Sequence, residues 1–342
     1  MSYFAHFGLK QEPFSNAPVS QFYYNSASHA QALERLTYVV SQAKGLALLV
    51  GDVGAGKSTL ARRLLDSLAE DEYEAALLVI IHSGITAQWL LKRIALQLGV
   101  EEPSDEKLTL LGQLYQRLLT IHESGRKAVL LIDEAQMLEN REVMEEFRGL
   151  LNLELPEHKL LTIVLFGLPE LEQHLKLDPP LDQRVSLKTR LQPLSAEATE
   201  AYIKHRLKIA GATRMPFSAE AVAAVHRFTG GIPRLINTLC DNCLFEGATM
   251  KRSLVNADLV RLCATDFGLV EGPTAQPPPT GAAHPAARPV VREAAAPPVT
   301  RPAPRPAGDQ NAARDPAGAA ANGTAADPGD LERFLSEGAQ KA

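Results

Sequence analysis

Short, almost wholly apolar runs recur along the first half of the chain, and amphipathic segments fill the intervals between them. Four of these runs have the length of buried strands, and they cover 46–50, 76–81, 128–132 and 160–166. The intervening segments repeat apolar residues at helical spacing, over 57–70, 86–98, 107–123 and 140–152. Because strands alternate with helices, the pattern predicts an α/β fold with a parallel sheet sandwiched by helices.

The pattern differs on either side of this region. After Pro193 it is helical only, and it predicts a small all-α lid with helices over 195–210, 218–229, 232–249 and 255–265. Before the first strand, an irregular, aromatic-rich entry segment leads into a predicted helix over 28–42. We therefore divide the ordered part into an entry segment with its helix, a nucleotide-binding core and a lid, over 1–44, 45–194 and 195–271.

Composition changes sharply near Gly272. Residues 272–328 are mostly Pro, Ala, Gly and Arg, and we expect a disordered linker because so few large apolar side chains cannot offset the entropy of ordering. The last segment, 329–342, differs because Leu331, Phe334 and Leu335 would share one side of a helical turn. Two interpretations stay open for it, a frayed terminus and a short docking helix.

Charge and cysteine content narrow the class of protein. The 342 residues carry a formal net charge of −5, which disfavours a protein that mainly coats nucleic acid. Cys240 and Cys243 fall in a predicted helix without a second Cys/His pair at suitable spacing, so we expect them to pack rather than bind metal. The amino terminus lacks a secretory signal pattern, and no apolar run approaches the ~18 residues of a membrane span. These features predict a cytoplasmic protein.

The strongest chemical signal directly follows the first predicted strand. The sequence there matches G-x-x-x-x-G-K-[ST], and a predicted helix leaves it, which is the context of a phosphate-binding loop. Lys57 would reach the β- and γ-phosphates, and Ser58 would hold Mg²⁺. The predicted nucleotide-binding residues are Gly51, Asp52, Val53, Gly54, Ala55, Gly56, Lys57, Ser58 and Thr59, together with Arg234 further along the chain.

A second signal ends the third predicted strand, where Asp133 and Glu134 follow the apolar run. Asp133 is predicted to bind Mg²⁺ opposite Ser58, and Glu134 to act as the general base on the attacking water. Alone, this pair could be a solvated acidic turn. Together with the upstream phosphate loop, it predicts an Mg²⁺-dependent nucleotide hydrolase.

Two arginines are candidates to complete the site. Arg184 precedes a predicted edge strand, and in ring-forming ATPases an arginine here reaches the γ-phosphate bound by the neighbouring subunit. A surface ion pair is the alternative, and Arg190 is the next candidate for the same role. Arg234 lies in the first turn of a helix that begins at Pro233, after a Gly-Gly break, and it could report the γ-phosphate to the lid. We count Lys57, Glu134, Arg184 and Arg234 as the predicted catalytic set.

These motifs, in this order, resemble the AAA+ ATPases, and more specifically the ExeA/GspA-type ATPases of general secretion and pilus systems. The similarity extends to the entry segment over 3–14, to Asp133-Glu134-Ala135-Gln136, to 166–171 and to 232–241, and it covers about 3–270. It implies ATP as the nucleotide and a homo-oligomer, most simply a ring. It also implies assembly or regulation of a secretion, pilus or polysaccharide-export apparatus through envelope partners, with membrane contact only through those partners.

Two alternatives stay open, and a departure from the family motivates the first of them. Members often have glutamine after the fourth strand, where this chain has Leu168, so hydrolysis could be slow or γ-phosphate sensing could fall elsewhere. The first alternative, motivated by Leu168, is a non-hydrolysing nucleotide switch that scaffolds partners. The second is an ATP-dependent DNA-binding regulator of the TnsC/TniB type, which the acidic balance disfavours.

Overall fold

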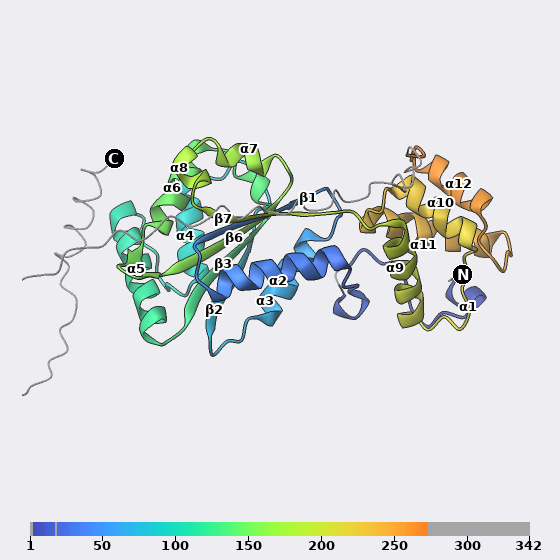
Figure 1. Ribbon diagram of the computed structural model, residues 1–342, viewed down its shortest axis with the longest axis horizontal. Helices are drawn as coiled ribbons and strands as arrows, with labels where there is room; N and C mark the ends of the chain where they lie inside the picture. The colour runs from blue at the N-terminus through green and yellow to red at the C-terminus, as the bar shows by residue number, and fades with distance from the viewer. Residues whose placement is uncertain (1–2, 18, 273–342) are drawn as a thin grey trace, which may run out of the picture. The chain divides into compact units, whose positions relative to one another are not determined.

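The computed structural model describes residues 3–17 and 19–272, and it confirms the predicted α/β fold (Figure 1). Five parallel strands form one sheet in the order β2-β3-β6-β1-β7. The strands are β1 (Leu46–Gly51), β2 (Tyr73–Val79), β3 (Lys127–Asp133), β6 (Leu161–Gly167) and β7 (Val185–Leu191). Because all are parallel, their carboxyl ends lie along one edge of the sheet. The predictions for the linker and for 329–342 lie outside the described residues.

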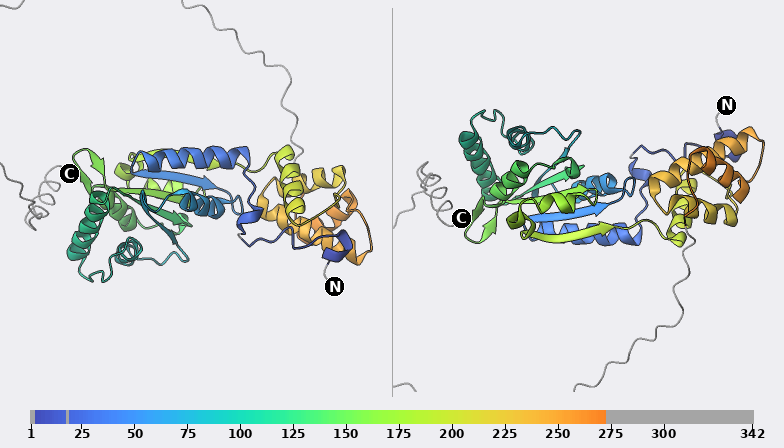
Figure 2. Two further views of the ribbon diagram at one scale, coloured as in Figure 1. Left: turned by 90° about the horizontal axis from the view of Figure 1, so that it is seen from below. Right: turned by 90° about the horizontal axis from the view of Figure 1, so that it is seen from above.

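Helices cover both faces of the sheet (Figure 2). One face packs against α2 (Ala27–Ser41) and α3 (Lys57–Ser67). The other packs against α4 (Ala87–Gln97), α5 (Lys107–Glu123), α6 (Arg141–Leu151), α7 (Leu171–Leu175) and α8 (Pro179–Asp182). Successive side chains of a strand point to opposite faces of the sheet. A continuous apolar run therefore contributes apolar side chains to the cores on both faces.

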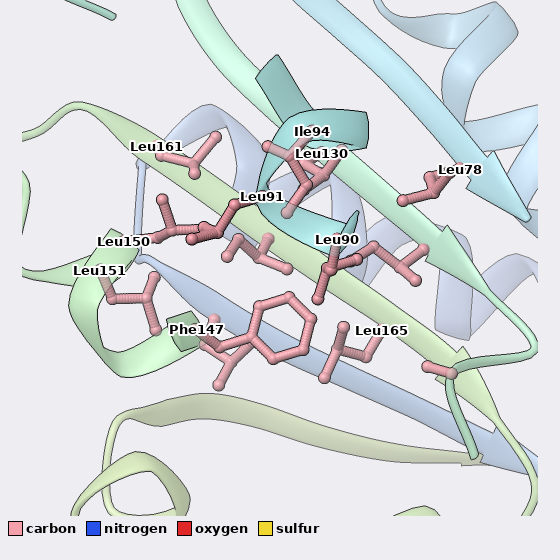
Figure 3. Close-up of a cluster of buried hydrophobic side chains, with 14 of the residues drawn as sticks. Leu78, Leu90, Leu91, Ile94, Leu130, Phe147, Leu150, Leu151, Leu161 and Leu165 are labelled. Atoms are coloured by element: carbon pink, nitrogen blue, oxygen red, sulfur yellow. The ribbon is translucent and has the colours of Figure 1, made fainter. Parts of the chain in front are cut away.

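The largest of the three hydrophobic clusters lies between the sheet and α4–α6 (Figure 3). Leu130 and Leu165 extend from neighbouring strands toward Leu90 of α4 and Phe147 of α6, and all four side chains are fully buried. Burial of one such side chain stabilises the fold by about 1.5–3 kcal/mol. This packing fixes β3 and β6 side by side, so the residues that follow each strand are held together.

The lid contains α9 (Ala196–Ile209), α10 (Ala219–Thr229), α11 (Pro233–Thr249) and α12 (Ala257–Asp266). Ser195, Ser218 and Asn256 each cap a helix by accepting a hydrogen bond from the backbone N–H three residues on. These caps mark the starts of α9, α10 and α12, which agree with the predicted starts to within two residues.

The entry segment contains α1 (Phe4–Phe7) and a 3-10 turn, η1 (Ser20–Phe22), and its aromatic residues pack into the core of the lid. Phe7, Phe14 and Phe22 are buried there, and Figure 1 shows α1 among the lid helices. By contrast, α2 packs on the sheet. The predicted segment 1–44 therefore contributes to two different hydrophobic clusters.

Several elements differ from the expectation. The edge strand β2 begins at Tyr73, three residues before the predicted start, because its first residues are polar or half-exposed and pair with Lys127 and Ala128 of β3. A small hairpin, β4 (Glu154–Leu155) and β5 (His158–Lys159), is too short to leave a periodic pattern, and α7 and α8 were not predicted. Within the described ranges, no helix combines the length and apolar character that crossing a bilayer requires.

Candidate functional site

The phosphate-binding loop joins the carboxyl end of β1 to α3, as predicted. Gly54 and Gly56 have φ values of +78° and +105°, which side chains rarely adopt. Space is also limiting, because a Cβ at Gly54 would lie 2.6 Å from Cβ of Arg234, and one at Gly56 would lie 2.7 Å from Nε2 of His29. Both glycines are therefore required by backbone conformation and by close neighbours.

Lys57 is buried inside this loop. Its Nζ donates hydrogen bonds to the carbonyl oxygens of Gly51 and Asp52, at 2.9 and 3.0 Å. Burial lowers the pKa of Lys57, while the nearby carboxylates of Glu134 and Asp133 oppose that shift. The loop thus holds a cation close to two acids at the end of β3.

Asp133 ends β3 and is buried, with its side chain accepting hydrogen bonds from the Ser58 hydroxyl and, at 3.0 Å, from the Glu134 N–H. Burial raises the pKa of Asp133, and the two hydrogen bonds oppose the shift. A hydroxyl and a carboxylate are hard oxygen donors, which suit Mg²⁺. The two predicted metal ligands, which come from separate elements, are in contact.

Glu134 follows with a left-handed backbone, at φ 56° and ψ 34°. This conformation costs a residue with a side chain on the order of 1–3 kcal/mol, and it occurs most often at functional sites. The Glu134 side chain accepts a hydrogen bond of 2.6 Å from Nε2 of Gln136. Glu134 is among the residues that line a cavity over the loop.

A cavity of about 220 Å³ lies over the loop. The core, the lid and the entry segment all line it. Of the predicted site residues, the structure brings to this cavity Val53, Gly54, Gly56, Lys57, Ser58, Thr59, Glu134 and Arg234. Aromatic residues of the entry segment, Tyr23 and Tyr24 among them, form another part of its wall.

The lid touches the loop through the start of α11. The backbone N–H of Arg234 donates to the Gly54 carbonyl at 3.3 Å, and the Arg234 side chain is exposed and lines the cavity. The Gly-Gly break is also needed, because Gly231 has φ +76° and a Cβ there would lie 2.0 Å from the Leu194 carbonyl oxygen. Arg234 therefore joins the lid to the loop at the predicted place.

Arg184 does not reach this cavity. Arg184 precedes β7, where Val185 pairs with Leu46 at the start of β1. The Arg184 guanidinium donates a hydrogen bond to the side-chain oxygen of Asn152. Gly51 lies five positions after Leu46 along β1, which corresponds to about 17 Å. The alternative candidate, Arg190, pairs with Val50 beside the loop, and it is exposed. Any role of Arg184 toward a nucleotide requires a second copy of the chain.

Three polar residues at the site were given no role from sequence. His29 of α2 is buried behind the loop. Its ring forms a hydrogen bond with the backbone of Ala55, and its Nδ1 lies 2.7 Å from Oγ of Ser26. Burial lowers the pKa of His29. The serine at the helix start was a visible capping signal, but the contact with the loop depends on the tertiary fold.

Arg206 of α9 is the second polar residue at the site that was given no role from sequence. Arg206 is buried, and it donates to the backbone carbonyls of Pro13 and Ser15 at 2.6 and 2.8 Å and to the Tyr202 hydroxyl. These bonds tie the entry segment to the lid beside the cavity.

Gln136 is the third such polar residue. It belongs to the sequence Asp133-Glu134-Ala135-Gln136 noted above, but no sequence rule predicted the hydrogen-bond partners of its amide.

The chain is similar to known proteins over the same region. Residues 40–175 match the family model described as an AAA domain. General secretion pathway protein A of Aeromonas hydrophila is 38% identical over 261 residues, which cover 75% of this chain and 47% of that protein. The chain therefore spans about half the length of this relative.

Solved structures share the fold at lower identity. The ORC2 protein of Aeropyrum pernix, in ADPNP–ADP complexes, matches with a TM-score of 0.58 at 15% identity, covering 75% of this chain and 72% of that one. Cdc6p of Pyrobaculum aerophilum matches with a TM-score of 0.55 at 19% identity, covering 74% of this chain and 70% of that one. Drosophila ORC bound to DNA matches with a TM-score of 0.53 at 19% identity, covering 76% of this chain and 67% of that one. At these identities the likeness shows the fold alone.

Proposed function

We propose that this chain, an AAA+ ATPase by family and a relative of general secretion pathway protein A, hydrolyses ATP with Mg²⁺. One observation carries the proposal. Lys57, Ser58 and Glu134 line one cavity, and the buried carboxylate of Asp133 accepts a hydrogen bond from the Ser58 hydroxyl, although Lys57 and Asp133 are far apart in sequence. Nucleotide binding alone would not need Glu134 at the cavity wall, so the arrangement favours hydrolysis.

Each group has a distinct role in the proposed reaction. The loop N–H groups, the helix start at Lys57 and the lysine ammonium would bind the phosphates. Ser58 and Asp133 would hold Mg²⁺, which neutralises charge on the β- and γ-phosphate oxygens when bound. Glu134 would accept the proton of the attacking water, and Arg234 would sense the γ-phosphate from the lid.

The cellular role is part of the same proposal, and similarity to the secretion-pathway relative supports it. We infer a homo-oligomer, most simply a ring, in which Arg184 of one copy reaches the nucleotide of the next. Such an assembly would act on a secretion apparatus, as the name of the Aeromonas relative suggests. We place it in the cytoplasm, where it would reach envelope components and membrane only through partner proteins. The exposed position of Arg184, away from its own loop, is consistent with a role across an interface.

Steady-state phosphate release from ATP, with and without Mg²⁺, tests the proposed reaction directly. We expect turnover by the wild type that requires Mg²⁺ and is lost in Glu134→Gln. An exposed carboxylate away from the cavity supplies the matched control, Glu157→Gln, which should retain the wild-type rate. Tight ATP binding with negligible turnover, unchanged by Glu134→Gln, would instead select a nucleotide switch.

A further inference from the structure

We propose that Gln136 is a positioning residue, which holds the carboxylate of Glu134 and links it to the end of β6. The inference rests on the proposed hydrolysis, because it concerns the base of that reaction. It assigns a function to a side chain that neither the phosphate loop nor the acidic pair includes.

The Gln136 amide makes two hydrogen bonds in opposite directions. Its Nε2 donates to Oε2 of Glu134 at 2.6 Å, and its Oε1 accepts from the backbone N–H of Leu168 at 3.1 Å. A carboxylate can only accept here and a backbone N–H can only donate, so one orientation of the amide satisfies both partners. Gln136 therefore bridges the residues that follow β3 and β6.

The surrounding backbone is shaped for this bridge. Gln136 lies on the 3-10 turn η2 (Ala135–Met137), directly after the left-handed Glu134, and only 9% of its surface is exposed. Gly167 ends β6, and a Cβ there would lie 3.0 Å from Oε1 of Gln136 and 2.7 Å from Cδ2 of Leu171. The glycine leaves room for the amide, so any larger residue would push Gln136 away from Leu168.

This bridge supplies a polar connection that the side chain of Leu168 cannot. Leu168 lines the cavity, and only its backbone is polar. Through Gln136, the backbone N–H of Leu168 is connected to the carboxylate of Glu134 in two hydrogen bonds. A shift at the carboxyl end of β6 would therefore move the base, although no polar side chain at position 168 contacts the nucleotide.

Two substitutions separate the two hydrogen bonds. Gln136→Met keeps the length and buried shape of the side chain but removes both bonds. Gln136→Glu keeps an acceptor for the Leu168 N–H, removes the donor to Glu134 and places two carboxylates together. Because a hydrogen bond to a charged group is involved, we expect Gln136→Met to lower kcat roughly 10–100-fold. Gln136→Glu should lower kcat at least as much.

Nucleotide affinity distinguishes positioning from a loss of structure. The dissociation constant for ATP should change less than about twofold in both variants, because Gln136 is not among the residues that line the cavity. In the Glu134→Gln background, Gln136→Met should cause no further loss of kcat. Gln173→Met, on the exposed surface of α7, is the matched control and should behave as the wild type.

The outcomes are separable. If the wild type hydrolyses ATP and Gln136→Met keeps its kcat, or loses affinity as much as kcat, this inference is overturned and the proposed function stands. If the wild type itself shows no turnover, both fail. A crystal structure of Gln136→Met adds a readout that needs no turnover, in which the Glu134 carboxylate should leave its observed position; an unchanged carboxylate would also overturn the inference.

Discussion

The two ends of the parallel sheet are built in different ways. At the carboxyl end, Lys57 and Asp133 are buried, and each has hydrogen-bond partners within the site. At the amino end, Lys44, Lys159 and Arg184 gather around a small hollow, all three exposed. Each of these cations bonds to a nearby side chain, respectively Tyr38, Glu154 and Asn152.

The difference shows which end can act alone. The carboxyl end already holds charged groups at fixed positions out of water, where electrostatic interactions are strongest. The cations of the amino end are hydrated and held by single contacts, so they would contribute only where another surface excludes water from them. We therefore assign binding and proton transfer to one end, and to the other a role that depends on assembly.

Replacement of Lys57 by alanine should have the largest effect. Lys57 is the buried cation that we propose to bind phosphate, so its loss is expected to weaken ATP binding about 10–100-fold and to abolish measurable turnover. A fluorescent ATP analogue titrated into the purified variant measures the affinity. Lys188→Ala, on the exposed side of β7, serves as the control. Equal affinity for the wild type and Lys57→Ala would place the phosphates elsewhere.

Glu134→Gln should separate chemistry from binding at the same end. Removal of a general base typically costs about 10²–10⁴-fold in rate, while the amide keeps the size of the side chain. We expect the variant to bind ATP as the wild type does and to release phosphate at that much lower rate. Single-turnover assays measure both quantities, and a fully active variant would exclude Glu134 as the base.

Arg184→Ala tests the amino end. The wild-type rate per subunit should rise with protein concentration. At concentrations where the wild type assembles, the rate of Arg184→Ala should be lower than the wild-type rate by roughly 10-fold or more. Arg190→Ala tests the second candidate under the same conditions. A rate per subunit that is flat with concentration and unaffected by Arg184→Ala would contradict a shared site.

His29 gives the smallest effect, on stability. Burial lowers the folded-state pKa of His29 below its ordinary value of 6.5, so the unfolded chain binds a proton first as pH falls. The free energy of unfolding should therefore decrease as pH falls below about 7.5, and the decrease should be smaller in His29→Gln. The pKa of His226 is also lowered by burial, but His226 is present in both proteins and its effect cancels. Urea unfolding at each pH measures the difference, and equal decreases would show that His29 does not carry the dependence.

Most of the sheet and the phosphate loop were predictable from sequence, because buried parallel strands are continuous apolar runs and the loop has a fixed motif. The start of β2 was not, since Tyr73 and Glu74 are polar residues of an edge strand. The site was predictable only where a motif specifies it. His29 contacts the backbone of Ala55, and Gln136 contacts the backbone of Leu168. In each pair the two residues are far apart in sequence, and the partner has an apolar side chain. Such contacts depend on how the elements pack, so the sequence alone does not predict them.

Calorimetric titration of the folded chain with ATP and Mg²⁺ tests the central claim most directly. The account predicts saturable heat with one nucleotide per chain, and a much weaker signal from Lys57→Ala under the same conditions. If ATP, ADP and a slowly hydrolysed analogue all produced no heat with the folded wild type, the proposed site would be contradicted.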